Sequence, residues 1–563
     1  MAAGRLSLLR SLTPWALLAL LGAEFALFDQ EGARHHSWIY PRWNDQVQYL
    51  TECYTGWEFM RAHGFWRGLW QTLVNPSAQG TLHDFAGVIA FTVAGGPSRS
   101  ALLALNMLAL IAWQAALFFA VGRTAGSRSL AWAAAALPLT LAWPWNGWAG
   151  SMADFRLDHF AMCAFGITLA VALLNDGFRS TRWSLAFGAT VGVTLLTRFL
   201  TGTYFALIFP TCLVWVLCSP DRGRRAGNLA VAALVAFALA APIFWLNREW
   251  VWNYYWIGHF TGPESAIRSP HMNLTHSVDF IWTHFSRDHL GPAFWRVAGA
   301  GSVVLAALAF VPRKRPAERE SASAGLGAPR DWLFFGTVFL LAPALVLTLH
   351  SQKSEIVLGV LVPGAFVIVL ALWSALQRRA TTRSPIQAHR ALNFGVAAGI
   401  VAFASWHFVA RQFAPPLDDD HADDLRSINR LADRVFASAN AGKLTRPWVG
   451  VNQISTGLDA LVLSVICYER HKTWVPFAMT LPTGIMEADE KLIMERVALS
   501  DFLFLVVDGP VSDWPFDQQQ RRLLPKVRAW CEANRHAVER YEIFGQRMVL
   551  YQRREIPFAS GRP

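Results

Sequence analysis

Long apolar runs separated by short polar loops occupy the first 410 residues and dictate a membrane-embedded helical fold. A helix needs about 20 mostly apolar residues to cross a bilayer, and most of these runs approach that length. We count about eleven such spans. They are approximately Leu8–Phe28, Ala101–Gly122, Leu130–Trp145, Asp158–Leu174, Ser184–Thr197, Thr201–Cys218, Leu229–Leu246, Val297–Pro312, Trp332–His350, Ile356–Leu376 and Leu392–Val409.

Basic residues test this count, because cytoplasmic loops of membrane proteins carry an excess of lysine and arginine. With the N-terminus in the cytoplasm, every loop on the inner side is basic, from Arg123 and Arg128 to Arg383 and Arg390. The large first loop, 29–100, and everything after Ala410 then lie on the outer side. We therefore expect a multi-pass protein of a bacterial inner (plasma) membrane whose C-terminal domain is periplasmic or extracellular.

The composition excludes one large soluble core and disfavours a nucleic-acid partner. Hydrophobic residues make up 53% of the chain and charged residues only 16%, whereas soluble proteins carry about a quarter charged residues. The net charge of +11 is spread over short loops, and nucleic-acid binding needs basic residues gathered on one face. The lipid bilayer is thus the expected environment.

The tail, 411–563, has interspersed charges and short apolar runs. Expected strands alternate with expected helices there, and a closing hairpin is centred on Gly545. The sequence therefore predicts a soluble α/β domain after a membrane module of residues 1–410. The strands are expected at 448–451, 474–479, 502–507, 538–544 and 546–552, and the helices at 458–469, 488–497 and 517–534.

Asp45 follows the first span in a long polar loop on the outer side. A solvated carboxylate in this place can take a proton from an attacking hydroxyl group. It can equally cap a helix that starts near Gln46. The stretch Tyr49–Met60 mixes aromatic and polar residues, and we assign Tyr49 and Glu58 to a substrate-binding surface.

A second acidic station lies at the outer end of the fourth span, where Asp154, Arg156, Asp158 and His159 come together. We expect Asp154 and Asp158 to lie one helical turn apart, with Arg156 placed to neutralise a phosphate. Two carboxylates can also hold a divalent cation such as Mg or Mn. The alternative is that the aspartates cap the helix and pair with Arg156 or His159. Ionisable groups beside the membrane favour a functional role.

Two basic residues sit between apolar spans on the outer side. Arg198 separates two short spans, and Lys353 lies in the polar turn His350–Glu355. Each can bind a phosphate group at the lipid surface, and each can also be an interfacial anchor whose charged end reaches water.

This pattern resembles the GT-C membrane glycosyltransferases, and is most similar to the family-39-type group of protein O-mannosyltransferases and aminoarabinose-transferase-like enzymes. Asp45 and Tyr49 after the first span match the first acidic station, and Asp154 with Asp158 matches the second. The run from Gly64 through Gly95-Gly96-Pro97-Ser98 to Asn106 also resembles the family. Gln46 departs from the pattern, because the family often has an acidic pair there.

The resemblance implies a GT-C-like membrane module and an inverting transfer of a sugar from a polyprenyl-phosphate donor to an acceptor hydroxyl. Asp45 would be the general base, Asp154 a second catalytic residue, and Arg156, Arg198 or Lys353 would offset the charge on the phosphate. Asp158 and His159 would help to bind the substrates. The acceptor would be a glycan, a lipid or a protein.

Two other functions stay open at this stage. A lipid or polysaccharide transporter places polar groups and broken helices near the bilayer midplane, whereas the acidic residues here cluster at outer helix ends. A non-catalytic subunit of an envelope-glycan assembly complex, with the C-terminal domain as a docking module, is the other alternative.

Overall fold

A computed structural model describes the chain over most of its length. The described residues are 2–32, 44–146, 150–262, 265, 273–310, 327–350, 353–381, 386–413, 422–445, 447–452, 460–475, 477–479, 489–510 and 518–557. The chain divides into two compact units. The first comprises residues 1–37 and 56–415, and the second comprises residues 38–55 and 416–563. The second unit thus contains the start of helix α3 (Asn44–His63) as well as the C-terminal tail.

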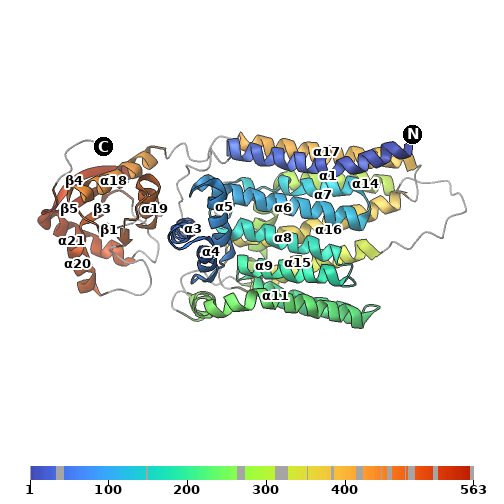
Figure 1. Ribbon diagram of the computed structural model, residues 1–563, viewed down its shortest axis with the longest axis horizontal. Helices are drawn as coiled ribbons and strands as arrows, with labels where there is room; N and C mark the ends of the chain where they lie inside the picture. Colours follow the sequence, from blue (N-terminus) through green and yellow to red (C-terminus); the bar gives the residue numbers. More distant parts are fainter. Residues whose placement is uncertain are drawn as a thin grey trace, which may run out of the picture. The chain divides into compact units, whose positions relative to one another are not determined.

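The first unit is built from long apolar helices that run side by side (Figure 1). Among the described residues, seven helices are long and apolar enough to cross a membrane. This gives the unit the character of a multi-pass membrane protein. The seven are Arg99–Ala125, Leu157–Leu174, Arg222–Thr261, Leu274–Ala309, Arg330–Leu349, Glu355–Arg379 and Asn393–Gln412. The count of eleven spans stays a prediction.

One predicted span is wrong as a continuous helix. The run Leu130–Trp145 forms only the short helix α7 (Arg128–Ala136), followed by two 3-10 turns, η2 (Leu137–Thr140) and η3 (Trp143–Trp145). Each turn has a proline at its first or second position, and proline lacks the backbone N–H that an α-helix needs. The run is nevertheless almost wholly buried.

Three helices fill the loop between the first span and the second. They are α3, α4 (Phe65–Val74) and α5 (Leu82–Ala94). The chain turns from α3 into α4 at Gly64, whose φ of 92° suits glycine. Gly68 then lies against Met60, because an added Cβ would be 2.4 Å from the Met60 Cβ. Helix α3 contains the stretch Tyr49–Met60, which the sequence marks in this loop.

The remaining helical elements of the first unit follow the chain in order. They are α1 (Ala2–Leu27), η1 (Phe28–Gly32), α6 (Arg99–Ala125), α8 (Leu157–Leu174), α9 (Thr181–Thr197), α10 (Thr201–Leu217), α11 (Arg222–Val251), η4 (Trp252–Thr261), α13 (Leu274–Thr283), η5 (His284–Leu290), α14 (Gly291–Phe310), α15 (Gly327–Leu349), η6 (Glu355–Leu361), α16 (Val362–Thr381) and α17 (Ile386–Gln412).

The second unit contains a five-stranded sheet in the order β2-β1-β3-β5-β4. Strands β1 (Val449–Asn452), β2 (Phe477–Met479) and β3 (Phe502–Asp508) are parallel, while β4 (Arg535–Ile543) and β5 (Gln546–Arg553) form an antiparallel hairpin. Both turn residues of the hairpin, Phe544 and Gly545, have positive φ, as a tight hairpin turn requires.

Four helices accompany this sheet. They are α18 (Ala422–Ala441), α19 (Ala460–His471), α20 (Glu490–Leu499) and α21 (Gln518–Asn534). A buried cluster joins residues of α20, β3, α21 and β5, including Val497, Leu503, Val527 and Val549. The start of α3 packs on α19, where the Tyr54 hydroxyl donates to Glu469 at 2.8 Å and the Tyr54 ring lies 5.2 Å from Tyr468.

Candidate active site

The acidic station before α8 is deeply buried in the first unit. Asp154, Arg156, Asp158 and His159 are each no more than 7% exposed. Helix α8 begins at Leu157, so Asp154 precedes the helix and the expected spacing of one helical turn is wrong. The buried charges still have to be paired with one another, because an isolated ion in such a place is strongly unfavourable.

Asp158 lies between two guanidinium groups. Arg156 Nε donates to Asp158 Oδ2 at 3.0 Å, and Arg198 forms an ion pair with the other carboxylate oxygen, Oδ1. We call Arg156, Asp158 and Arg198 the arginine–aspartate cluster. Its side chains are all less than 10% exposed. The cluster brings two guanidinium groups together, and guanidinium is the side-chain group that binds phosphate oxygens in a bidentate way.

The position of Arg198 follows from the turn between α9 and α10. Helix α9 ends at Thr197 and α10 begins at Thr201, so residues 198–200 form the turn between them. The sequence predicts a break at this place. Thr201 Oγ1 donates to the Arg198 carbonyl at 2.7 Å. Arg198 is therefore held in a rigid turn at the end of α9, although 40 residues of chain separate it from Asp158.

A second segment supports the same turn from outside. Phe199 N donates to the Gln79 carbonyl at 2.7 Å, and Thr81 N donates to the Leu196 carbonyl at 3.0 Å. Gly80 lies so close that an added Cβ would be 2.2 Å from the Thr197 carbonyl oxygen. Residues 79–81 therefore fix the turn that carries Arg198, and only glycine fits at the centre of the contact.

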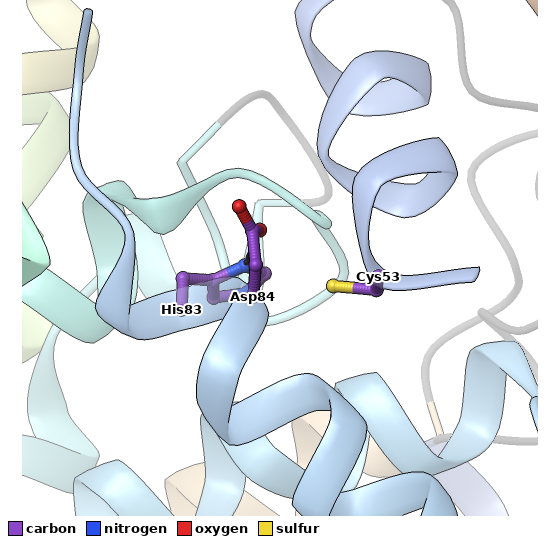
Figure 2. Close-up of side chains that lie close together, drawn as sticks. All are labelled: Cys53, His83 and Asp84. Atoms are coloured by element: carbon purple, nitrogen blue, oxygen red, sulfur yellow. Dashed lines mark ion pairs between the residues drawn. The ribbon is translucent and has the colours of Figure 1, made fainter. Parts of the chain in front are cut away.

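Helix α5 starts directly after this segment with a buried polar pair. His83 Nδ1 and Asp84 Oδ1 are 3.6 Å apart, and the two residues are 1% and 4% exposed. The His83 ring meets the edge of Phe160 in α8 with ring centroids 6.1 Å apart. Figure 2 shows His83 and Asp84 side by side at the start of α5; Cys53, also drawn there, belongs to the second unit.

Asp154 is held by the backbone of its own turn. Gly150 N donates to Asp154 Oδ2, and Gly150 has a φ of 79°. Asp154 Oδ1 is buried and has no hydrogen-bond partner among the described residues. Burial raises the pKa of Asp154 to about 6, although the charge of Arg156 opposes the shift. A carboxyl group with this pKa changes its charge near neutral pH.

Asn106 of α6 is a part of this site that sequence reasoning did not assign. Its Nδ2 donates to the Asp154 carbonyl at 2.8 Å and to the Met152 carbonyl at 3.3 Å. Asn106 is 1% exposed. It therefore ties the turn before α8 to α6. The signal that could have found it is an amide side chain within the apolar run Ala101–Gly122, which also contains Gln114.

The described side-chain contact of His159 is with its own helix. Its Nε2 lies 3.6 Å from Cys163 Sγ, one turn further along α8. Both residues are almost fully buried. The substrate-binding role assigned to His159 stays a prediction.

Lys353 has a structural role in the described contacts. Its Nζ donates to the carbonyls of Leu347, Thr348 and His350 at 3.1, 2.7 and 2.6 Å. Leu347 and Thr348 belong to the last turn of α15, whose carbonyls lack partners within the helix, and His350 directly follows it. Burial lowers the pKa of Lys353. An ammonium group has only three N–H donors, so binding a phosphate would require Lys353 to release the helix end.

The residues assigned after the first span fall in both units. Asp45 is in the first turn of α3, but its side chain lies outside the described residues, so its role stays a prediction. Tyr49 is 3% exposed and belongs to the second unit. Glu58 belongs to the first unit and pairs with Arg61 at 3.5 Å on an exposed surface.

A divalent cation between Asp154 and Asp158 finds little support in this geometry. Each carboxylate oxygen of Asp158 already faces a guanidinium group. A bound cation would have to displace one arginine or lie beside both, and like charges at such distances repel strongly in a buried site. The assignment of Mg or Mn stays a prediction.

Comparison with solved structures shows which known fold this chain shares. Two structures of ArnT from Cupriavidus metallidurans, one in the apo state and one bound to undecaprenyl phosphate, superpose with TM-scores of 0.57 and 0.56. The alignments cover 98% of this chain and 100% of each ArnT chain. The chain shares the fold of ArnT.

The sequence identity with ArnT is low, 14% and 15% in the two alignments. No family model matches the sequence, and no curated protein matches it. The resemblance to GT-C glycosyltransferases expected from the sequence is therefore confirmed at the level of the fold.

Proposed function

We propose that the protein is an integral-membrane glycosyltransferase that moves a sugar from a polyprenyl-phosphate donor to an acceptor hydroxyl on the outer face of the membrane. The observation that carries the proposal is the arginine–aspartate cluster, which is buried at the start of α8 in a chain with the fold of ArnT. ArnT has been crystallised with undecaprenyl phosphate. A lipid-linked phosphate is the class of ligand that two buried arginines can bind.

The arginines supply the electrostatic part of the reaction. The donor is a phosphodiester with one negative charge, and loss of the sugar turns its phosphate into a monoester that gains charge. Guanidinium groups fixed in advance stabilise such developing charge without reorganising. Asp158 holds Arg156 and Arg198 in place before the donor arrives.

The chemical step is a single displacement. The acceptor oxygen attacks the anomeric carbon from the side opposite the phosphate, the bond from that carbon to the phosphate oxygen breaks, and polyprenyl phosphate leaves. The configuration of the sugar is inverted. Asp45 takes the proton of the acceptor hydroxyl as general base, and Asp154 is a second carboxylate of the site.

The position in the cell forms part of the proposal. The basic loops favour an N-terminus in the cytoplasm of a bacterium and a C-terminal unit outside the inner membrane. The acceptor is a hydroxyl-bearing glycan, lipid or protein reached from that side.

The test is incubation of the purified full-length protein with polyprenyl-phosphate sugars and a panel of acceptors, with release of polyprenyl phosphate as the measurement. We expect release that depends on the acceptor and stops in Asp45→Asn, while the variant elutes and melts like the wild type. Normal release by Asp45→Asn removes the base assignment. Movement of the intact sugar lipid across a vesicle membrane without release would assign a transporter instead.

A further inference from the structure

An open apolar groove of about 330 Å³ lies between α14 and α17. Its walls are valine, alanine, glycine, isoleucine and phenylalanine side chains, and Arg296 is the one charged residue that lines it. Neither the arginine–aspartate cluster nor Asp154 contributes to it. The groove is therefore separate from the candidate active site.

Small residues lie on both walls of the groove. On α14, Gly301 packs on Trp373 of α16, because an added Cβ would be 2.7 Å from that ring. On α17, Gly399 borders open space, because an added Cβ would meet nothing within 4 Å. No described side chain of the protein fills the volume next to Gly399.

The groove follows the helix axes. Successive spans alternate in direction, so α17, the third span after α14, runs opposite to it. Arg296 and Phe403 therefore mark one end of the groove, and Val304 and Val396 mark the other. The eight steps along the chain from Arg296 to Val304 correspond to about 12 Å along a helix.

Arg296 stands at the boundary between polar and apolar sequence. It precedes the apolar run Val297–Phe310, is exposed, and has no hydrogen-bond or ion-pair partner among the described residues. A guanidinium group beside hydrocarbon is unfavourable unless it reaches the interface or finds an anion. Arginine binds phosphate oxygens well because its N–H donors form a planar fork.

We propose that this groove binds one glycerophospholipid of the bilayer, with the phosphodiester on Arg296 and an acyl chain along the groove towards Val304 and Val396. An anionic head at one end and an apolar trench running from it match the two halves of such a lipid. The lipid seals the gap that the small residues leave between α14 and α17, and it acts as a structural component of the first unit. The proposal does not depend on glycosyl transfer.

The test counts bound lipids by native mass spectrometry on the full-length protein in mild detergent, titrated with phosphatidylglycerol. We expect the wild type to bind one molecule. Gly399→Leu fills the groove and should weaken binding at least tenfold. Gly299→Leu is the matched control, because that position is equally open but does not line the groove.

A second variant separates the head from the chain. Arg296→Gln should lower the affinity for phosphatidylglycerol to that for diacylglycerol, which lacks the phosphate. Arg296 is exposed, so this variant should fold normally even if Gly399→Leu does not. Equal binding by the wild type, Gly399→Leu and Arg296→Gln would overturn the proposal. Displacement of phosphatidylglycerol by an equimolar polyprenyl phosphate would also overturn it and assign the groove to a carrier lipid.

Discussion

Asn106 Nδ2 lies 2.8 Å from the backbone carbonyl oxygen of Asp154 and donates a hydrogen bond to it. The same amide reaches the Met152 carbonyl, so one side chain of α6 holds both ends of the turn before α8. Asp154 owes its position to this contact and to Gly150. A buried amide that binds two backbone carbonyls is a strong local constraint, because the carbonyls have no water to replace it.

We predict that Asn106→Leu lowers kcat of sugar transfer by roughly 10- to 100-fold with little change in KM, since a small displacement of a site group has effects of this size. Gln114→Leu is the matched control. Gln114 lies on the same helix, is equally buried, and donates to the Ala135 carbonyl at 3.0 Å, away from the turn. Equal losses in both variants would show that the effect is one of stability alone.

The arginine–aspartate cluster predicts that Arg198 is not replaceable by lysine. Arg198→Lys keeps the charge but loses the planar fork, so we expect kcat/KM for the lipid-phosphate donor to fall at least tenfold.

Asp158→Ala removes the anion that lies between two buried guanidinium groups and should destabilise the fold by about 3–5 kcal/mol. Thermal unfolding and donor titration separate the two effects.

An exposed ion pair supplies the control for this prediction. Arg248 and Glu249 are 3.2 Å apart with side chains 51% and 78% exposed. Arg248→Lys should change stability by less than about 1 kcal/mol. An equal change of kcat/KM for the donor in Arg198→Lys and Arg248→Lys would contradict the assignment of a phosphate site.

Asp154 should make stability depend on pH in a defined direction. Burial raises its pKa from 3.8 to about 6, so the folded protein binds the proton more tightly than the unfolded chain does. The resulting stabilisation is complete below pH 4 and is lost as the pH rises through 6. The shift corresponds to roughly 3 kcal/mol.

The measurement compares the thermal unfolding of the wild type with that of Asp154→Asn at pH 5 and pH 7.5. The asparagine cannot ionise, so the variant should gain stability relative to the wild type at the higher pH. In the activity assay, transfer should fall below pH 6 if ionised Asp154 takes part. A Tm difference that does not change between the two pH values would contradict the shift.

Apolar patterns and turn residues in the sequence predict single helices, strands and breaks well. Strand β3 occupies Phe502–Asp508, where an apolar run of strand-forming residues ends before Gly509-Pro510. The break at Arg198 is likewise visible in the sequence. The error at Leu130–Trp145 has a physical cause, because the run stays apolar on average across Pro138 and Pro144 although neither proline can donate a backbone hydrogen bond to a helix.

The candidate site is harder to reach from sequence because its contacts are distant in the chain. Three members of the site can be recognised as charged residues at the edge of an apolar run, namely Asp154, Arg156 and Asp158. Their meeting with Arg198 depends on how α8 and α9 pack, which no local pattern encodes. The role of Asn106 cannot be predicted from the sequence, because its partners are backbone carbonyl groups, which every residue has.

Lys353 offers a test between two roles. If it only caps α15, Lys353→Met removes three hydrogen bonds to buried carbonyls and should destabilise the protein by roughly 1–3 kcal/mol. The KM for the donor should then change less than threefold. A large rise in KM with an unchanged Tm would instead support the phosphate-binding role expected from the sequence.

In the second unit, stability should depend on Arg535. This residue is 5% exposed, and its guanidinium donates to the carbonyls of Val497, Ala498 and Asp501 at 3.1, 2.8 and 3.3 Å. Two of these carbonyls belong to the last turn of α20, which lacks partners within the helix. The single side chain therefore ties α20 to the first residue of β4.

We expect Arg535→Met to destabilise the second unit by about 2–4 kcal/mol, because it leaves three carbonyls without their donor while the methionine still fills part of the space. Arg426→Met is the control, since Arg426 lies on an exposed face of α18 and pairs with Asp423. Amide hydrogen exchange in β3 reports on this unit in the full-length protein. Faster exchange in Arg535→Met but not in Arg426→Met is the expected result, and equal protection in both would show that α20 is held by its apolar contacts alone.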